Sequence, residues 1–283
     1  MIRPPKPKPL PRPKTMTIAA GMVCPDGIVI AADSQESWGE SKTHIHKISV
    51  LDEPKMKAIF TGAGIGWFID YARDKVFAFL RQTKPARVAD VESGFTDLMN
   101  SLYEKEFKNF PGDFDKGVSL LLAVKVGDER PALFSCDSVL VRRVKDTRLV
   151  GTELWANEAN ELQQLRLTLI HARWVSAYLI WRGKSSAADV GGRTNVFSLS
   201  NDGKIFKENS FLLMRKEHFF DRLEALRNAA LLSIHPFTST STVSTYQKWI
   251  GNVIRETRKE FSAIDAAHKR QEKRVGSWKE RNL

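Results

Sequence analysis

The stretch TIAAGMVCPDGIVIAADS, residues 17–34, decides the fold. Two runs of apolar and small residues, 17–24 and 28–33, flank the turn Pro25-Asp26-Gly27, which is the pattern of a β-hairpin. Two further short strands are predicted beyond it, at 44–51 and 57–61. The ordered part of the chain therefore begins with four strands.

Strands and helices then alternate in blocks. Apolar residues at helical spacing predict helices over 67–81, 88–107 and 155–181. Further strands are predicted at 118–126, 132–136, 139–144, 195–200 and 205–206. Such segregated blocks favour an α+β fold with two antiparallel sheets over a doubly wound parallel sheet.

The two ends of the chain differ in composition from its middle. Residues 1–16 are basic and rich in proline, a composition that cannot pack a core, so we expect this extension to be disordered or removed. Residues 17–207 form the predicted main domain, and 208–283 a basic helical extension with helices at 211–232 and 246–274.

Charge and cysteine content exclude several classes of protein. The net charge is +11, but residues 1–14 and 248–283 each carry +5, which leaves the body nearly neutral and argues against nucleic-acid binding as the main function. No apolar run is long enough to span a bilayer. The two cysteines, Cys24 and Cys136, are interpreted as buried apolar residues, and a cytoplasmic location is expected.

Four residues in the first strands suggest chemistry. Thr17 and Asp33 stand on adjacent predicted strands, Lys47 on the third, and Gly62 after the fourth. A hydroxyl, a carboxylate, an ammonium and a backbone donor are the parts of an N-terminal nucleophile site. In such a site the threonine uses its own α-amine, with an ordinary pKa of about 8, as the base for its hydroxyl.

Residues 17–66 resemble the start of a proteasome β-type peptidase. The resemblance lies in Thr-x-x-x-Gly at 17–21, Asp26-Gly27 in the turn, and Val-Ile-Ala-Ala-Asp-Ser at 29–34. Residues 31–39 also resemble the simpler bacterial peptidase that partners an ATP-dependent unfoldase. The resemblance implies a four-layer αββα sandwich that cleaves peptide bonds through an acyl-enzyme on Thr17, without a cofactor or metal.

The resemblance also implies a role for other residues. Asp33 and Lys47 would form a charge pair, and Gly62 would donate to the oxyanion. Thr152 and Asp189 would support the site, although Gly151-Thr152-Glu153 stands where the family often has Gly-Ser-Gly. The implied substrate pocket consists of Glu36, Ile45, Ser49 and Phe60. The implied partners are peptide or protein substrates, further copies in a homo-oligomeric ring, and an ATP-dependent unfoldase.

Catalysis requires Thr17 to be the first residue. Two routes lead to it: translation from Met16 followed by removal of that methionine, or autolytic removal of a 16-residue propeptide. Without either, the alternative is an inactive scaffold or assembly subunit; small-amide hydrolysis on the same fold is a third interpretation. His44 and His46 could together contribute to a metal site, but no further ligand is evident, and solvent-facing imidazoles are the favoured interpretation.

Overall fold

A computed structural model describes residues 17–38, 41–108, 117–151, 166–187 and 190–281. The chain forms two compact units, residues 1–210 and 211–283. The predicted boundaries at 16/17 and 207/208 stay predictions. No helix among the described residues is both long and apolar enough to cross a bilayer.

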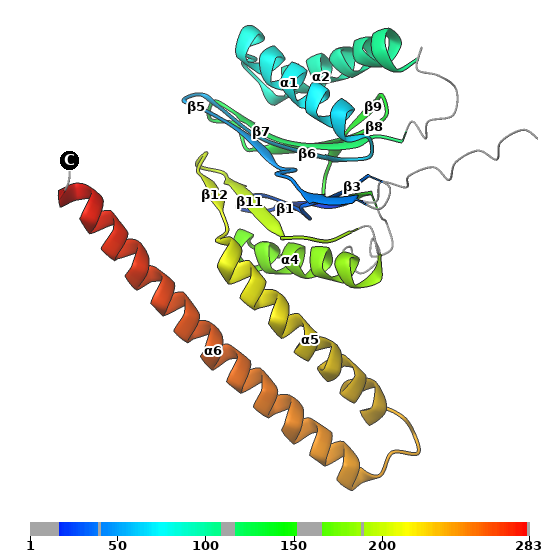
Figure 1. Ribbon diagram of the computed structural model, residues 1–283, viewed down its shortest axis with the longest axis vertical. Coiled ribbons are helices and arrows are strands. Elements are labelled where there is room, and N and C mark those ends of the chain that lie inside the picture. Colours follow the sequence, from blue (N-terminus) through cyan, green and yellow to red (C-terminus); the bar gives the residue numbers. More distant parts are fainter. Residues whose placement is uncertain (1–16, 39–40, 109–116, 152–165, 188–189, 282–283) are drawn as a thin grey trace, which may run out of the picture. The chain divides into compact units, whose positions relative to one another are not determined.

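The first unit contains two five-stranded antiparallel sheets (Figure 1). One has the order β10-β1-β2-β11-β12 and consists of β1 (Ile18–Cys24), β2 (Gly27–Ala32), β10 (Thr147–Gly151), β11 (Asn195–Ser200) and β12 (Ile205–Lys207). The other runs in chain order through β5 (Ser49–Glu53), β6 (Met56–Ala63), β7 (Ser119–Val126), β8 (Ala132–Asp137) and β9 (Leu140–Val144). A separate ribbon pairs β3 (Gln35–Trp38) with β4 (Ser41–His44).

Helices cover the outer faces of both sheets, as Figure 1 shows. The β5–β9 sheet carries α1 (Gly66–Thr83) and α2 (Val88–Leu102), which continues into the π-helical turn η1 (Tyr103–Phe107). The β1–β2 sheet carries α4 (Leu169–Ser186). The Asp26 carboxylate in the hairpin turn accepts a hydrogen bond from Leu169 N–H, which fixes the start of α4.

Two apolar cores hold these layers together. One lies between the sheets and includes Ile28, Ile59 and Leu121. The other lies between the β5–β9 sheet and helices α1 and α2, and includes Phe60, Phe95 and Phe134. The predicted α+β fold with a four-layer αββα arrangement is confirmed, because each sheet buries one face on the other sheet and one on helices.

Three local predictions were wrong. The strand expected over 44–51 is interrupted, since β4 ends at His44 and β5 begins at Ser49, where the chain passes from the ribbon into the β5–β9 sheet. Strands β3 and β10 were not predicted, because their short, partly polar sequences become strands only through pairing with β4 and β1. Of the helix expected over 155–181, residues 155–165 lie outside the described residues; α4 begins at Leu169, after Arg166 with its φ of 48°.

The second unit is a two-helix hairpin. Its helices are α5 (Ser210–Ser233), which begins one residue before the unit, and α6 (Thr240–Arg281). They lie antiparallel: the Phe219 and Phe261 rings contact at 4.3 Å between centroids, and Arg222 forms an ion pair with Glu260 at 3.5 Å. The break between the helices expected at 211–232 and 246–274 is shorter in the structure, because α6 already begins at Thr240.

Candidate active site

Thr17 lies immediately before β1, where that strand is held between two others. Its neighbour Ile18 pairs with Gly151 of β10, and Ala19 pairs with Ala32 of β2. Gly151 has a φ of 91°, and a Cβ atom there would collide with the Thr17 carbonyl oxygen. Glycine at 151 therefore permits the close approach of β10 that keeps Thr17 buried, with 8% of its surface exposed.

The Asp33 carboxylate, at the end of β2, is fully buried and accepts four hydrogen bonds. Three come from backbone N–H groups, of Ile18 at 3.3 Å, Gln35 at 3.2 Å and Gly191 at 3.3 Å. The fourth comes from the Lys47 ammonium at 2.9 Å. A buried carboxylate needs such donors to offset the loss of water, so this set fixes the position of Asp33.

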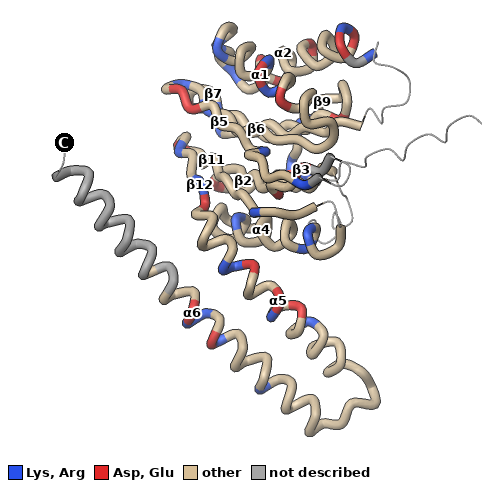
Figure 2. The backbone as a smooth tube through the Cα atoms, in the orientation of Figure 1, with Lys and Arg blue, Asp and Glu red and all other residues tan. Residues whose placement is uncertain are grey.

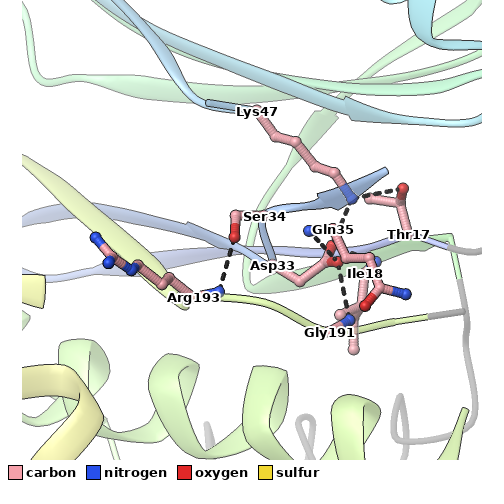
Figure 3. A network of polar contacts seen from close by, with 8 residues as sticks. All are labelled: Thr17, Ile18, Asp33, Ser34, Gln35, Lys47, Gly191 and Arg193. Atoms are coloured by element: carbon pink, nitrogen blue, oxygen red, sulfur yellow. Dashed lines mark hydrogen bonds and ion pairs between the residues drawn. The ribbon is translucent and has the colours of Figure 1, made fainter. Parts of the chain in front are cut away.

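Lys47 joins Asp33 to Thr17. Its Nζ lies 2.9 Å from Thr17 Oγ1 and 2.9 Å from Asp33 Oδ1 (Figure 3). The Lys47 side chain is 7% exposed, and burial lowers its pKa below 10.5, although attraction to Asp33 and Glu36 opposes the shift. The structure thus brings together three of the predicted catalytic side chains in one hydrogen-bonded network.

The segment around Ser34 and Gly191 supports this arrangement. Ser34 N–H and Gln35 N–H both donate to the Gly191 carbonyl, and Arg193 N–H donates to Ser34 Oγ at 2.7 Å (Figure 3). Gly192 has a φ of 72°, so the Gly191-Gly192 pair permits a turn that other residues disfavour. The Gly-Gly dipeptide was the sequence signal for this support, but its contacts with Ser34 were not predicted.

A pocket opens beside Thr17. Lys47 and Gly62 line it together with all four residues expected there, Glu36, Ile45, Ser49 and Phe60. Six lining residues were not predicted: His46, Gly64, Gly66, Ile69, Asp70 and Arg73. Those from Gly66 onward belong to α1. Asp70 and Arg73, two polar residues one helical turn apart on that helix, were the sequence feature that could have indicated its part in the pocket.

Gly62 occupies a crowded position on β6. A Cβ atom there would lie 2.8 Å from Leu120 and 3.1 Å from Ile69, so a larger residue would push α1 away from the sheet. Thr152 and Asp189, the two other residues predicted to support the site, lie outside the described residues.

The described residues contain no group of three or more His, Cys, Asp or Glu side chains able to hold a metal ion. His44 and His46 are exposed. Burial raises the pKa of both Cys24 and Cys136 to about 12, so neither supplies a thiolate at neutral pH. Among the described residues, the nucleophile that the geometry favours is Thr17.

Comparison with known proteins reveals a shared fold. No family model matches the sequence, and no curated protein matches it. Anbu (ancestral beta-subunit) from Yersinia bercovieri superposes with a TM-score of 0.64 and 12% identity, over 79% of this chain and 99% of that chain. The Anbu (Gly-1) mutant from Hyphomicrobium sp. strain MC1 gives a TM-score of 0.66 and 13% identity, over 79% and 100%.

A third structure, the helical assembly of the Anbu complex from Pseudomonas aeruginosa, gives a TM-score of 0.59 and 15% identity, over 80% of this chain and 99% of that chain. The chain therefore shares the fold of these Anbu subunits.

These matches correct the family resemblance. The assignment to the proteasome β-type peptidases is wrong, because the three matching structures described above are Anbu proteins, a distinct family. The hairpin motif at residues 17–34 did not distinguish them, since in this chain it encodes the pairing of β1 with β2 and the position of Asp33, and a fold does not define a family.

Proposed function

We propose that the protein is a threonine-type N-terminal nucleophile hydrolase that cleaves peptide bonds through an acyl-enzyme on Thr17. The observation that carries this proposal is the position of Lys47 Nζ, 2.9 Å from both Thr17 Oγ1 and Asp33 Oδ1, at the wall of a pocket. An ammonium held against a hydroxyl lowers the cost of forming an alkoxide at that oxygen.

The acylation step follows from these contacts. The neutral α-amine of a terminal Thr17 takes the hydroxyl proton as Oγ1 attacks the substrate carbonyl carbon, and Lys47 stabilises the charge that develops on Oγ1. Gly62 N–H donates to the resulting oxyanion. Collapse of the tetrahedral intermediate breaks the C–N bond, and the departing amine receives the proton from the α-ammonium.

In deacylation, water is the nucleophile and Thr17 Oγ1 is the leaving group. The α-amine, neutral again, takes a proton from water, whose oxygen attacks the ester carbonyl, and the proton then passes to Thr17 Oγ1 as the acid product leaves. Asp33 does not react; it is a positioning residue that holds Lys47. Thr152 and Asp189 stay predictions as support for the α-amine.

Activity requires cleavage between Met16 and Thr17, because an amide nitrogen has no basic lone pair. Intact-mass analysis of the purified protein should show Thr17 as the first residue. If no molecule begins at Thr17, the base is missing and the scaffold interpretation replaces this proposal.

Thr17→Ala provides the direct test. Hydrolysis of fluorogenic peptides should fall by about 10³-fold or more, because the nucleophile is lost, while circular dichroism stays unchanged. Thr17→Ser should keep measurable turnover, and Thr43→Ala, at an exposed position of β4, is the matched control. Full activity in Thr17→Ala would contradict the proposal, and turnover of acyl-amides without peptides would favour the small-amide alternative.

We further propose that the chain acts as a homo-oligomer. The Anbu complex from Pseudomonas aeruginosa forms a helical assembly, and this chain shares the fold of its subunit. Light scattering after size exclusion, with electron microscopy, would separate a closed ring from an open helix, and a monomer at micromolar concentration would contradict the proposal. An unfoldase partner and a cytoplasmic location stay predictions.

A further inference from the structure

We propose that the pocket beside Thr17 accepts a cationic substrate side chain, lysine or arginine, and that Glu36 is the carboxylate that pairs with it. This inference rests on the proposed function, since it concerns substrate selection at the same site. Four observations carry it: the balance of the pocket's charges, the isolation of Glu36, the position of Glu36 near α1, and the apolar walls.

The cations that line the pocket already have partners. Lys47 is paired with Asp33 at 2.9 Å. Arg73 is shared between Asp70 at 2.7 Å and Asp74 at 2.9 Å. Two carboxylates on one guanidinium leave an excess of negative charge at this wall. Among the described residues, the pocket therefore has no unpaired lysine or arginine that would attract an acidic substrate side chain.

The Glu36 carboxylate, by contrast, makes no hydrogen bond or ion pair with any of the residues that the structure describes. It belongs to β3, its side chain is half-buried, and it lines the pocket together with Thr17. Its charge is close enough to Lys47 to favour the ammonium form. A half-buried carboxylate without a partner attracts a cation that enters the pocket.

The start of α1 helps to hold the Glu36 carboxylate at the pocket. A Cβ atom on Gly66 would collide with Glu36 Oε1, so the carboxylate lies directly against the first residue of the helix. The first turn of α1 contains no acidic residue, and the N-cap residue Ile65 makes no capping hydrogen bond from its side chain. The positive end of the helix dipole thus lies beside the Glu36 carboxylate, a favourable placement for a negative charge.

Apolar residues provide part of the wall. Phe60 is 1% exposed, and Ile45 and Ile69 are half-buried beside it. Lysine and arginine have long hydrocarbon stems that pack against apolar surface while the charged group reaches a partner. Apolar surface beside an unpaired carboxylate therefore fits these two side chains.

The test compares arginine with citrulline, its neutral isostere, at the cleavage position of otherwise identical fluorogenic peptides. The wild-type kcat/KM should favour arginine by about tenfold or more, the effect of one charge-assisted hydrogen bond. Glu36→Gln should reduce this ratio about tenfold, and Glu36→Lys should shift the preference to a glutamate peptide. Glu92→Gln, on α2 and outside the pocket, is the control that should keep the ratio.

A binding measurement tests the cationic pocket independently of the proposed hydrolysis. Fluorescence anisotropy with Thr17→Ala protein measures the affinity of the arginine and citrulline peptides without turnover. If wild-type protein cleaves neither peptide, the proposed function fails, and a tenfold preference in binding still supports the cationic pocket. Equal affinity for the two peptides, or an unchanged preference in Glu36→Gln, would overturn the inference.

Discussion

The sheet unit and the helical hairpin differ in which side chains they bury: the sheet unit buries a charged group, and the hairpin exposes large apolar ones. In the sheet unit, Asp33 is fully buried yet receives four hydrogen bonds, including one from Lys47 at 2.9 Å. In the hairpin, Ile234 is 78% exposed and Phe237 is 91% exposed, both in the loop between the helices. Between Glu224 and Glu256 the hairpin has no acidic residue, a stretch that is mostly uncharged in Figure 2.

This difference shows where each unit is sensitive to substitution. Around Thr17, the same side chains stabilise the fold and would perform the chemistry, because a buried charge without its partner is costly. At the end of the hairpin, exposed apolar side chains contribute little to the folding of their own unit. Substitutions in the two units should therefore differ in size and even in sign.

The largest effect is expected for Asp33→Ala. It removes the acceptor of three backbone N–H groups and leaves the Lys47 ammonium buried without its partner, so the free energy of unfolding should fall by about 3–5 kcal/mol. Urea denaturation followed by circular dichroism measures it. Asp97→Ala, at an exposed position of α2, is the control and should change the free energy of unfolding by less than about 0.5 kcal/mol. An equal loss of stability in the two variants would show that the buried contacts of Asp33 are not the cause.

Gly151→Ala should destabilise the sheet unit by about 1–3 kcal/mol, because a residue with a side chain at positive φ is strained. The new Cβ would also press on the Thr17 carbonyl oxygen. Hydrogen exchange of peptides from β1, read by mass spectrometry, should accelerate.

Gly251→Ala is the counterpart in the hairpin. No atom lies within 4 Å of the Cβ that it adds, and the residue is inside α6. The hairpin should become more stable by about 1 kcal/mol, since alanine favours a helix over glycine. A destabilised hairpin in this variant would contradict the proposed difference in sign.

The pH dependence of hydrolysis tests the role of Lys47. The proposed mechanism requires its ammonium, and burial lowers the pKa of Lys47 below 10.5, so activity should fall as the pH rises through that lowered value. On the acid side, activity should rise as the α-amine loses its proton and becomes able to act as a base. Lys47→Arg keeps a positive charge at every accessible pH, so the alkaline decline should disappear; an identical decline would assign it to another group.

Phe237→Ser should have the smallest effect on folding. A side chain that is 91% exposed buries little surface, so the free energy of unfolding should change by less than about 0.5 kcal/mol. Urea denaturation tests this, and a loss above about 1 kcal/mol would show that Phe237 packs within its own unit.

The prediction of the strands worked best where local pattern is sufficient. Strands β1, β2, β6 and β7 lie within a residue or two of their predicted bounds, because long apolar runs and turn residues define them. Strand β10 and the interruption at 45–48 depend on partners far along the chain and were missed. Asp70 and Arg73 were not expected in the pocket because their place there depends on how α1 packs beside distant parts of the chain.

By itself, the sequence determined an α+β chain that opens with a hairpin and carries Thr17, Asp33, Lys47 and Gly62 in that order, because strand periodicity and turn chemistry are local properties. Only the tertiary structure decided that Lys47 Nζ meets both Thr17 and Asp33, and that Glu36 stands unpaired against α1. Those contacts depend on how two sheets and a helix pack, and residue spacing along the chain does not specify that geometry.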